Sequence, residues 1–144
     1  MPIVPKITAV SAGDIAGQGL KAQRTRMNVI AQNIANAMAT RTPEGGAFRR
    51  QLVVLKGEQL TPRPGSNDFG VKVDKIVGDP SPLRMVYNPS HPDADANGYV
   101  AYPNVDLAIE MVDMVSAQRA YEANVAVILS GKRMRQKAIE IIEA

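Results

Sequence analysis

Residues 104–144 read NVDLAIEMVDMVSAQRAYEANVAVILSGKRMRQKAIEIIEA. From Leu107 onward, side chains on alternating steps of four and three residues are mostly apolar, and no proline interrupts the run. This 3.5-residue period is typical of a helix that packs against another helix through one continuous face. The positions on that face are Leu107, Met111, Met114, Gln118, Tyr121, Val125, Ile128, Lys132, Arg135, Ile139 and Ile142.

Such a helix would be too long for its own chain to cover. It would measure about 60 Å, whereas a compact domain of 144 residues is about 37 Å across. A second set of apolar residues lies off the main face: Ile109, Val112, Val115, Val127, Leu129, Met134 and Ile141. We expect this second set to pack against neighbouring molecules, which predicts a subunit of an assembly.

A second helix is predicted near the N-terminus, where residues 6–42 contain no proline. Ser11 and Asp14 have the spacing of a capping box at a helix start. We expect this helix to end near Met38. Two rows of residues spaced by seven form one face of it. These rows are Gly13, Leu20, Met27 and Ile34, and Ala16, Gln23, Ile30 and Ala37.

The middle of the chain has the composition of short strands. Residues 48–55, 69–77 and 83–87 are rich in β-branched and apolar side chains and are bounded by Gly, Pro or Asn. Asn97-Gly98 predicts a two-residue hairpin turn, and Asn104 is the expected N-cap of the long helix.

The predicted fold class is therefore α+β, with the two terminal helices paired as a helical hairpin or coiled coil around an inserted, loop-rich β unit. The expected segments are an N-terminal helical arm (1–42), a β-rich insertion (43–103) and the long C-terminal helix (104–144).

The composition argues against several functions. Without cysteine, the chain can form no disulfide, thiolate metal site or cysteine nucleophile. We expect no cleavable signal peptide and no membrane-spanning segment. The cations Lys132, Arg133, Arg135 and Lys137 are interpreted as complementing the helix dipole, as Asp106, Glu110 and Asp113 do at its start, rather than as a nucleic-acid patch.

A calcium-binding turn is the main alternative function. Asp93, Asp95 and Asn97 match the first half of an EF-hand loop, but Asn104 stands where the loop needs a bidentate carboxylate. A polar turn is the better interpretation. His91 is the single histidine and is expected in a loop, and no catalytic motif is present, so we predict no enzyme, no metal site and no cofactor.

Residues 27–37, MNVIAQNIANA, resemble the N-terminal motif of the bacterial flagellar rod, hook and filament-type axial proteins. Residues 94–100, ADANGYV, the following PNVD at 103–106, and residues 110–124 resemble the proximal rod subunits of this family. The resemblance covers both ends of the chain and the junction before the last helix.

The resemblance implies a structural subunit of the flagellar rod, a drive shaft that crosses the periplasm and transmits torque. It also implies export by the flagellar type III apparatus without a cleaved signal. The implied partners are further copies of the chain, the other proximal rod subunits, the adaptor next to the export gate, and the distal rod.

We predict that the two helices assemble through a defined set of packing residues, in which the asparagines fix the register. This set is Leu20, Met27, Ile30, Asn33, Ile34 and Asn36 from the N-terminal helix, and Leu107, Met111, Met114, Tyr121, Asn124, Val125 and Ile128 from the C-terminal helix.

Overall fold

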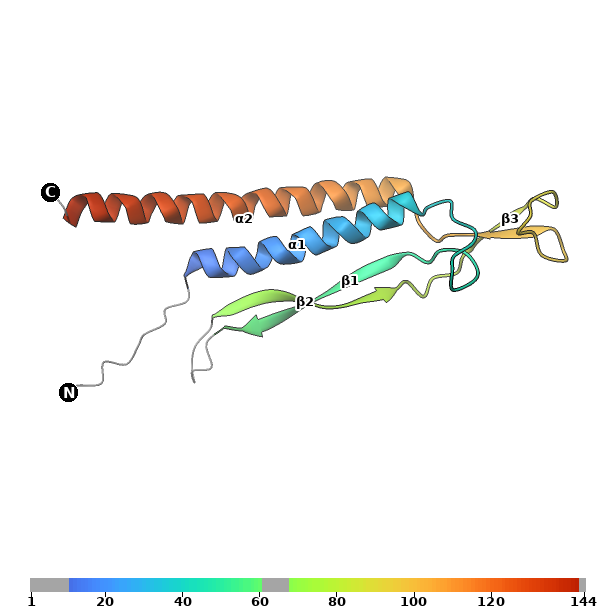
Figure 1. The fold of residues 1–144 in the computed structure, drawn as a ribbon, viewed down its shortest axis with the longest axis horizontal. Helices are drawn as coiled ribbons and strands as arrows, with labels where there is room; N and C mark the ends of the chain where they lie inside the picture. Colours follow the sequence, from blue (N-terminus) through green and yellow to red (C-terminus); the bar gives the residue numbers. More distant parts are fainter. Residues whose placement is uncertain (1–10, 61–67, 143–144) are drawn as a thin grey trace.

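A computed structural model describes residues 11–60 and 68–142. Helix α1 (Ala12–Ala35) and helix α2 (Leu107–Ile142) run antiparallel, side by side (Figure 1). Between them in sequence lie two hairpins, β1 (Gln51–Gln59) with β2 (Phe69–Gly78), and β3 (Arg84–Tyr87) with β4 (Tyr99–Tyr102). The predicted α+β fold, with a β region inserted between two terminal helices, is confirmed.

The start of α1 follows its predicted cap. The Ser11 hydroxyl accepts from the backbone N–H of Asp14, and the Asp14 carboxylate accepts from the backbone N–H of Ser11. The helix ends at Ala35, three residues before the predicted Met38, because the next residue leaves helical geometry. Asn36 forms the C-cap and its side chain donates to the carbonyl of Gln32.

The start of α2 uses a different cap from the predicted one. The Asp106 carboxylate accepts from the backbone N–H groups of Ala108 and Ile109, which satisfies donors that the first helical turn leaves free. The prediction that Asn104 caps this helix was therefore wrong. The dipole interpretation of the C-terminal cations was also wrong, since the last turn of α2 holds no basic residue and the dipole effect fades within one turn.

The inserted β region consists of two two-stranded antiparallel sheets. In the first, Gln51 lies opposite Gly78 and Gln59 opposite Phe69, with a bulge between Val54 and Leu55. In the second, Arg84 lies opposite Tyr102 and Tyr87 opposite Tyr99.

The predicted two-residue hairpin turn at Asn97-Gly98 was wrong, because β3 and β4 are joined by the whole of residues 88–98. Asn97 and Gly98 belong to a smaller turn inside that connection, held by the Asp95 carboxylate, which accepts from the backbone N–H groups of Asn97 and Tyr99. Gly98 has φ +81°, and a Cβ there would lie 2.9 Å from the Tyr87 ring.

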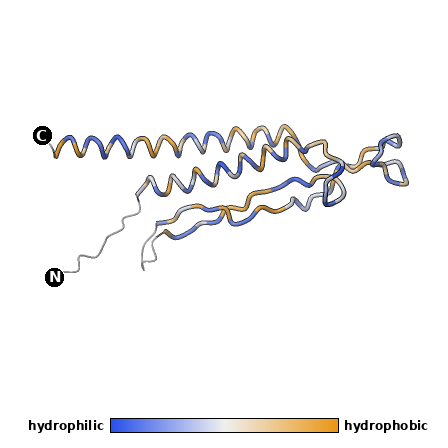
Figure 2. Tube along the Cα trace, viewed as in Figure 1, coloured by the Kyte–Doolittle hydropathy of each residue, from blue (hydrophilic) through white to orange (hydrophobic). Residues whose placement is uncertain are grey.

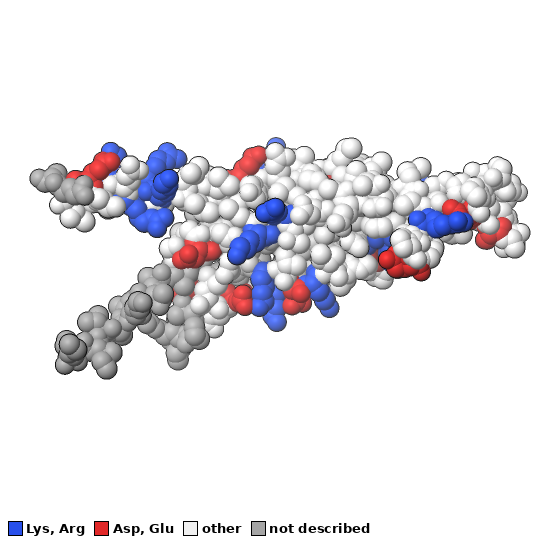
Figure 3. Space-filling model, in the orientation of Figure 1, with Lys and Arg blue, Asp and Glu red and all other residues white. Residues whose placement is uncertain are grey.

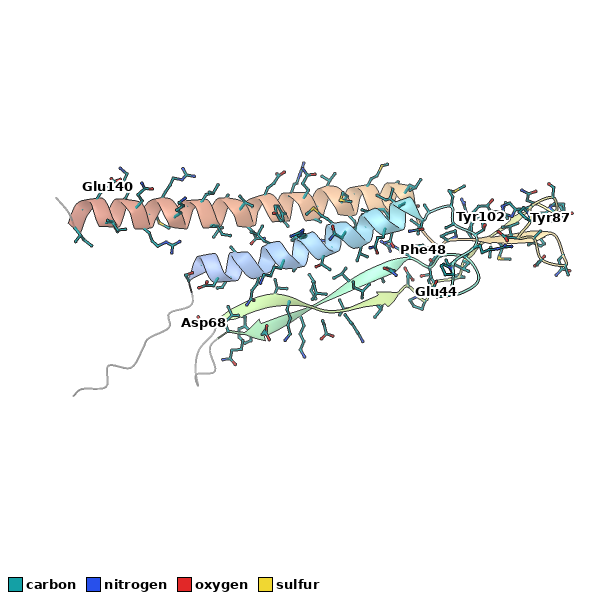
Figure 4. The ribbon with its side chains drawn as sticks, in the orientation of Figure 1. Glu44, Phe48, Asp68, Tyr87, Tyr102 and Glu140 are labelled. Carbon is teal, nitrogen blue, oxygen red and sulfur yellow. The ribbon has the colours of Figure 1, made fainter. Side chains whose placement is uncertain are left out.

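The molecule is elongated and has three layers in its middle part, with α1 between α2 and the β1–β2 hairpin (Figure 1). The β3–β4 hairpin extends past the ends of both helices, so that Tyr87 and Glu140 lie at opposite ends of the molecule (Figure 4). The buried apolar residues are few and mostly small: Ala16, Ala22, Val29, Ile30, Ala37, Val100 and Ala117.

Candidate assembly interface and buried polar joint

One face of α2 packs against α1. Ala117 is fully buried there, and Met114, Tyr121, Val125 and Ile128 are half-buried. On α1, Ile30 and Asn33 are buried, while Leu20, Met27 and Ile34 are half-buried. Leu107 and Met111, which the sequence analysis placed in the same seam, are 45% and 58% exposed. Both side chains therefore keep about half of their surface exposed in the single chain.

Many apolar side chains on the remaining surface of α2 are exposed. Hydrophobic residues, orange in Figure 2, alternate with hydrophilic ones along the whole helix. α2 also continues past the start of α1, so no described helix lies beside its C-terminal end (Figure 1). We define the outer face of α2 by the exposed residues Leu107, Ile109, Met111, Val112, Val115, Val127, Leu129, Met134 and Ile141. In the view of Figure 3, mostly uncharged atoms cover the start of α2, whereas Lys and Arg gather near its C-terminal end. Exposed apolar surface is a mark of protein–protein contact sites.

The outer face is hollowed near the start of α2. Met111, Val112, Val115 and Arg119 line an open depression of about 290 Å³, and nearly all of its lining is apolar. A depression with apolar walls can accept an apolar side chain of another molecule.

Small residues bring the two helices close together. A Cβ on Gly19 would lie 2.8 Å from Oδ1 of Asn124, so glycine is what allows this approach. The Asn124 amide donates within its own helix to the Ala120 carbonyl, 2.8 Å away. Three asparagines were proposed to fix the register. Asn36 and Asn124 each donate to a carbonyl four residues earlier in the same helix, whereas Asn33 bonds to β1 and α2.

Asn33 lies in a buried polar cluster that joins α1, β1 and α2. Its Nδ2 donates to the Gln51 carbonyl at 2.9 Å and to Glu110 Oε2 at 3.1 Å, and its Oδ1 accepts from the Gln51 backbone N–H at 2.9 Å. Asn33 and Glu110 are each only 1% exposed. Arg50 Nε donates to Glu110 Oε1 at 2.5 Å, so the buried carboxylate is both paired and hydrogen-bonded.

Further charged groups surround this cluster. Arg50 also approaches Asp113 at 3.4 Å and Asp79 at 3.6 Å, and Arg26 of α1 donates to Asp113 at 3.2 Å. The three carboxylates raise the pKa of Arg50 despite the opposing effect of burial. We call Asn33, Arg50, Gln51 and Glu110, with Asp113 and Asp79, the polar joint.

The sequence analysis did not identify the pairing of Glu110 with Arg50 and treated Glu110 as a helix-dipole residue. A usable signal existed, because Glu110, Ala117 and Asn124 are spaced by seven and so share the face that packs against α1. A carboxylate on a packed face requires a partner. Periodicity could not show that the partner is Arg50, which is 60 positions away.

The hydrogen bonds of Asp79 make this end of the molecule sensitive to acid. The Ser81 hydroxyl and backbone N–H donate to the Asp79 carboxylate, and with the nearby Arg50 guanidinium they hold its pKa below the ordinary value of 3.8. Because the folded-state pKa is lowered, this contribution to stability is present at neutral pH. It is lost as the pH falls through the ordinary carboxyl range toward the folded value.

We therefore expect Ser81→Ala to flatten the loss of thermal stability between pH 6 and about pH 3, because the hydroxyl that favours the ionised carboxylate is gone. The measurement is the unfolding midpoint as a function of pH. Ser90→Ala is the matched control, since its hydroxyl donates to the neutral amide of Asn88. Equal slopes in wild type and Ser81→Ala would contradict this assignment.

The residues of the alternative calcium site are engaged in other interactions. Asp93 accepts from the Thr40 hydroxyl and pairs with Arg41, while Asp95 caps the turn described above. The hydrogen bond from Thr40 and the ion pair with Arg41 lower the pKa of Asp93, although burial opposes this shift. Within residues 11–60 and 68–142, no three His, Cys, Asp or Glu side chains come together as a metal site would require. His91 lies in the loop, where its Nδ1 accepts from the backbone N–H of Asp93.

Two family models match the helical ends of the chain. The model described as "Flagella basal body rod protein" matches residues 14–40, which include most of α1 and Asn33. The model described as "Flagellar basal body rod FlgEFG protein C-terminal" matches residues 96–141, which include most of α2 and Glu110.

Curated relatives match nearly the whole chain. It is 45% identical to the flagellar basal-body rod protein FlgC of Borreliella burgdorferi, with 92% of this chain and 97% of that protein covered. Identity is 44% to FlgC of Salmonella typhimurium, with 89% and 93% covered, and 42% to FlgC of Bacillus subtilis, with 94% and 99% covered. The chain therefore belongs to the FlgC family of flagellar basal-body rod proteins, and it is a structural protein rather than an enzyme.

Proposed function

We propose that this chain, a structural subunit of the proximal rod, binds its neighbours in the rod through the outer face of α2. The observation that carries the proposal is the exposure of that face along a 36-residue helix that α1 covers on one side. Val112, Met134 and Ile141 are 69%, 66% and 76% exposed. In an assembly their burial would stabilise contact by roughly 25 cal/mol per Å² of apolar surface removed from water.

The proposed contacts are heterologous, which means that one patch meets a different patch on the next subunit. Such contacts build an open helical polymer when the rotation does not close. Densely packed helices barely compress, so a wall made of them would transmit torque with little deformation. The proposed partners are other copies of this chain, the other proximal rod subunits, the adaptor beside the export gate, and the distal rod.

We further infer that the three segments have different roles. Segments 1–42 and 104–144, which contain α1 and α2, would form the packed wall, and the insertion 43–103 would supply contacts beyond it. We propose the periplasmic rod of the basal body as the location and the flagellar type III apparatus as the export route. No helix among the described residues has the length and apolarity needed to cross a bilayer.

Cysteine protection tests the proposed contact face, because the natural chain has no cysteine. We expect Val127→Cys to react rapidly with a maleimide in the free chain and at least tenfold more slowly in isolated basal bodies. Val127 is 44% exposed in the single chain and would be covered by a neighbour in the rod. Basal bodies denatured before labelling give the total reactive cysteine, and equal rates in the free and assembled states would refute the proposal.

A further inference from the structure

The base of the β1–β2 hairpin is bonded to both helices. At the base of the hairpin, the Gln51 backbone and the Arg50 side chain make directional bonds to Asn33, Glu110 and Asp113. These hydrogen bonds and ion pairs between described residues lie together at the end where β1 begins and β2 ends.

Away from that base, the hairpin packs on α1 and leaves open grooves beside the contact. One groove of about 350 Å³ is lined by Gln18, Lys21, Ala22 and Thr25 from α1 and by Glu58, Val71, Lys72 and Val73 from the strands. A second, of about 400 Å³, adjoins the polar joint and reaches Leu55. Where these grooves open, the strands and α1 lack the dispersion contacts that would fix one against the other.

Strand β2 makes a close contact with α1 farther along the hairpin. A Cβ on Gly70 would lie 1.8 Å from Oε1 of Gln18, so the strand backbone approaches α1 closely there. That oxygen is buried and has no hydrogen-bond partner among the described residues. This contact limits how near the hairpin can come to α1.

We propose that Asn33 is the positioning residue that sets the angle of the β1–β2 hairpin on the helix pair. Its amide binds both backbone groups of Gln51, as a neighbouring strand would, and its remaining donor hydrogen binds Glu110 of α2. One buried side chain therefore fixes β1 to both helices at once. The helix pair has its own apolar contact and does not need this bond to stay together.

Asparagine is specified at this position by its donors and acceptor. Aspartate has the same shape but offers no N–H, and its charge would lie about 3 Å from the Glu110 carboxylate. Alanine keeps the helix but leaves the Gln51 backbone groups and one Glu110 oxygen without these partners. Both substitutions act on the joint and leave the α1–α2 packing residues unchanged.

A rod subunit would use this joint to hold its hairpin at a constant angle under load, a consequence that rests on the proposed function. The positioning role itself is a property of the single chain. It can therefore be tested on the free protein, where failure would not bear on the contact face of α2.

Distance measurements between paired spin labels test the joint, and the absence of natural cysteine places each label unambiguously. Labels on cysteines at Lys75 and Ser116 measure the distance between the hairpin and α2. Labels at Arg24 and Ser116 measure the distance between α1 and α2. All three positions are exposed. The measurement is the width of each distance distribution in the full chain, with helix content followed by circular dichroism.

We expect Asn33→Asp and Asn33→Ala to widen the hairpin–helix distribution at least twofold while the helix–helix distribution keeps its wild-type width. Asn28→Ala, an exposed asparagine on the same helix, is the matched control and should change neither. An unchanged hairpin distribution would overturn the proposal, and so would widening of both distributions or loss of helix content in both Asn33 variants. If the aspartate variant alone unfolds, the alanine variant decides.

Discussion

Replacing Arg50 with methionine is expected to lower the free energy of unfolding by about 3 kcal/mol, the low end of the cost of breaking a buried ion pair. Glu110 would stay 1% exposed but lose its cationic partner, leaving the Asn33 amide as its hydrogen-bond donor. The low end applies because Arg50 itself is 21% exposed. Urea unfolding followed by circular dichroism measures the change.

A double variant separates the loss of the pair from general damage. Arg50→Met with Glu110→Leu removes both charges, and replacing a buried pair by apolar groups is often close to neutral. We expect the double variant to regain most of the stability lost in Arg50→Met. Arg119→Met is the control, because Arg119 is exposed on α2 and should change stability by less than about 0.5 kcal/mol. A double variant no more stable than Arg50→Met would count against the joint as a paired buried charge.

Placing a charge on the outer face of α2 is expected to abolish swimming without unfolding the chain. Val112 is 69% exposed, so Val112→Asp should change the stability of the free protein by less than about 0.5 kcal/mol. In a rod the same carboxylate would be buried against a neighbour without a partner, which costs several kcal/mol per contact and repeats in every copy. Motility and basal-body counts in cells that carry only the variant measure this effect.

Met114→Asp gives the opposite pattern and serves as the comparison. Met114 is half-buried against α1, so its replacement should destabilise the free protein itself. Normal swimming with Val112→Asp would contradict the proposed contact face. A Val112→Asp protein that is as unstable as Met114→Asp would show that the outer face already packs within one chain.

The sequence predicted the arrangement of elements well because that information is periodic and local. The apolar repeat of α2, the Ser11–Asp14 cap and the composition of the strands each depend on neighbouring residues, and all three led to the observed elements. The errors at Asn97 and Asn104 have a common cause. Several residues near each site can form a cap or a turn, and the structure uses Asp106 and Asp95 instead, because Asn104 is engaged with the backbone of Arg50 and Ser81.

The interface was harder to predict because a helical repeat does not tell which stripe faces the partner within the chain. The predicted seam included Leu107 and Met111, whereas the most buried residues of α2 are Glu110 and Ala117. Gly19 of α1 permits a close approach to Asn124 that a larger side chain would prevent. The polar joint depends on residues far apart in sequence, and only the tertiary structure brings them together.

The single-sided cover of α2 has a consequence for how a shaft of these molecules would lengthen. Each newly bound copy would cover apolar surface of the previous copy and expose apolar surface of its own. The growing end would therefore remain able to bind the next copy, while the sides of the shaft would not. A copy in the interior would be more stable than a free copy, because it is bound to neighbouring copies on every side. Both the elongation of the shaft and its stability would thus depend on the outer face of α2, with no separate activating step.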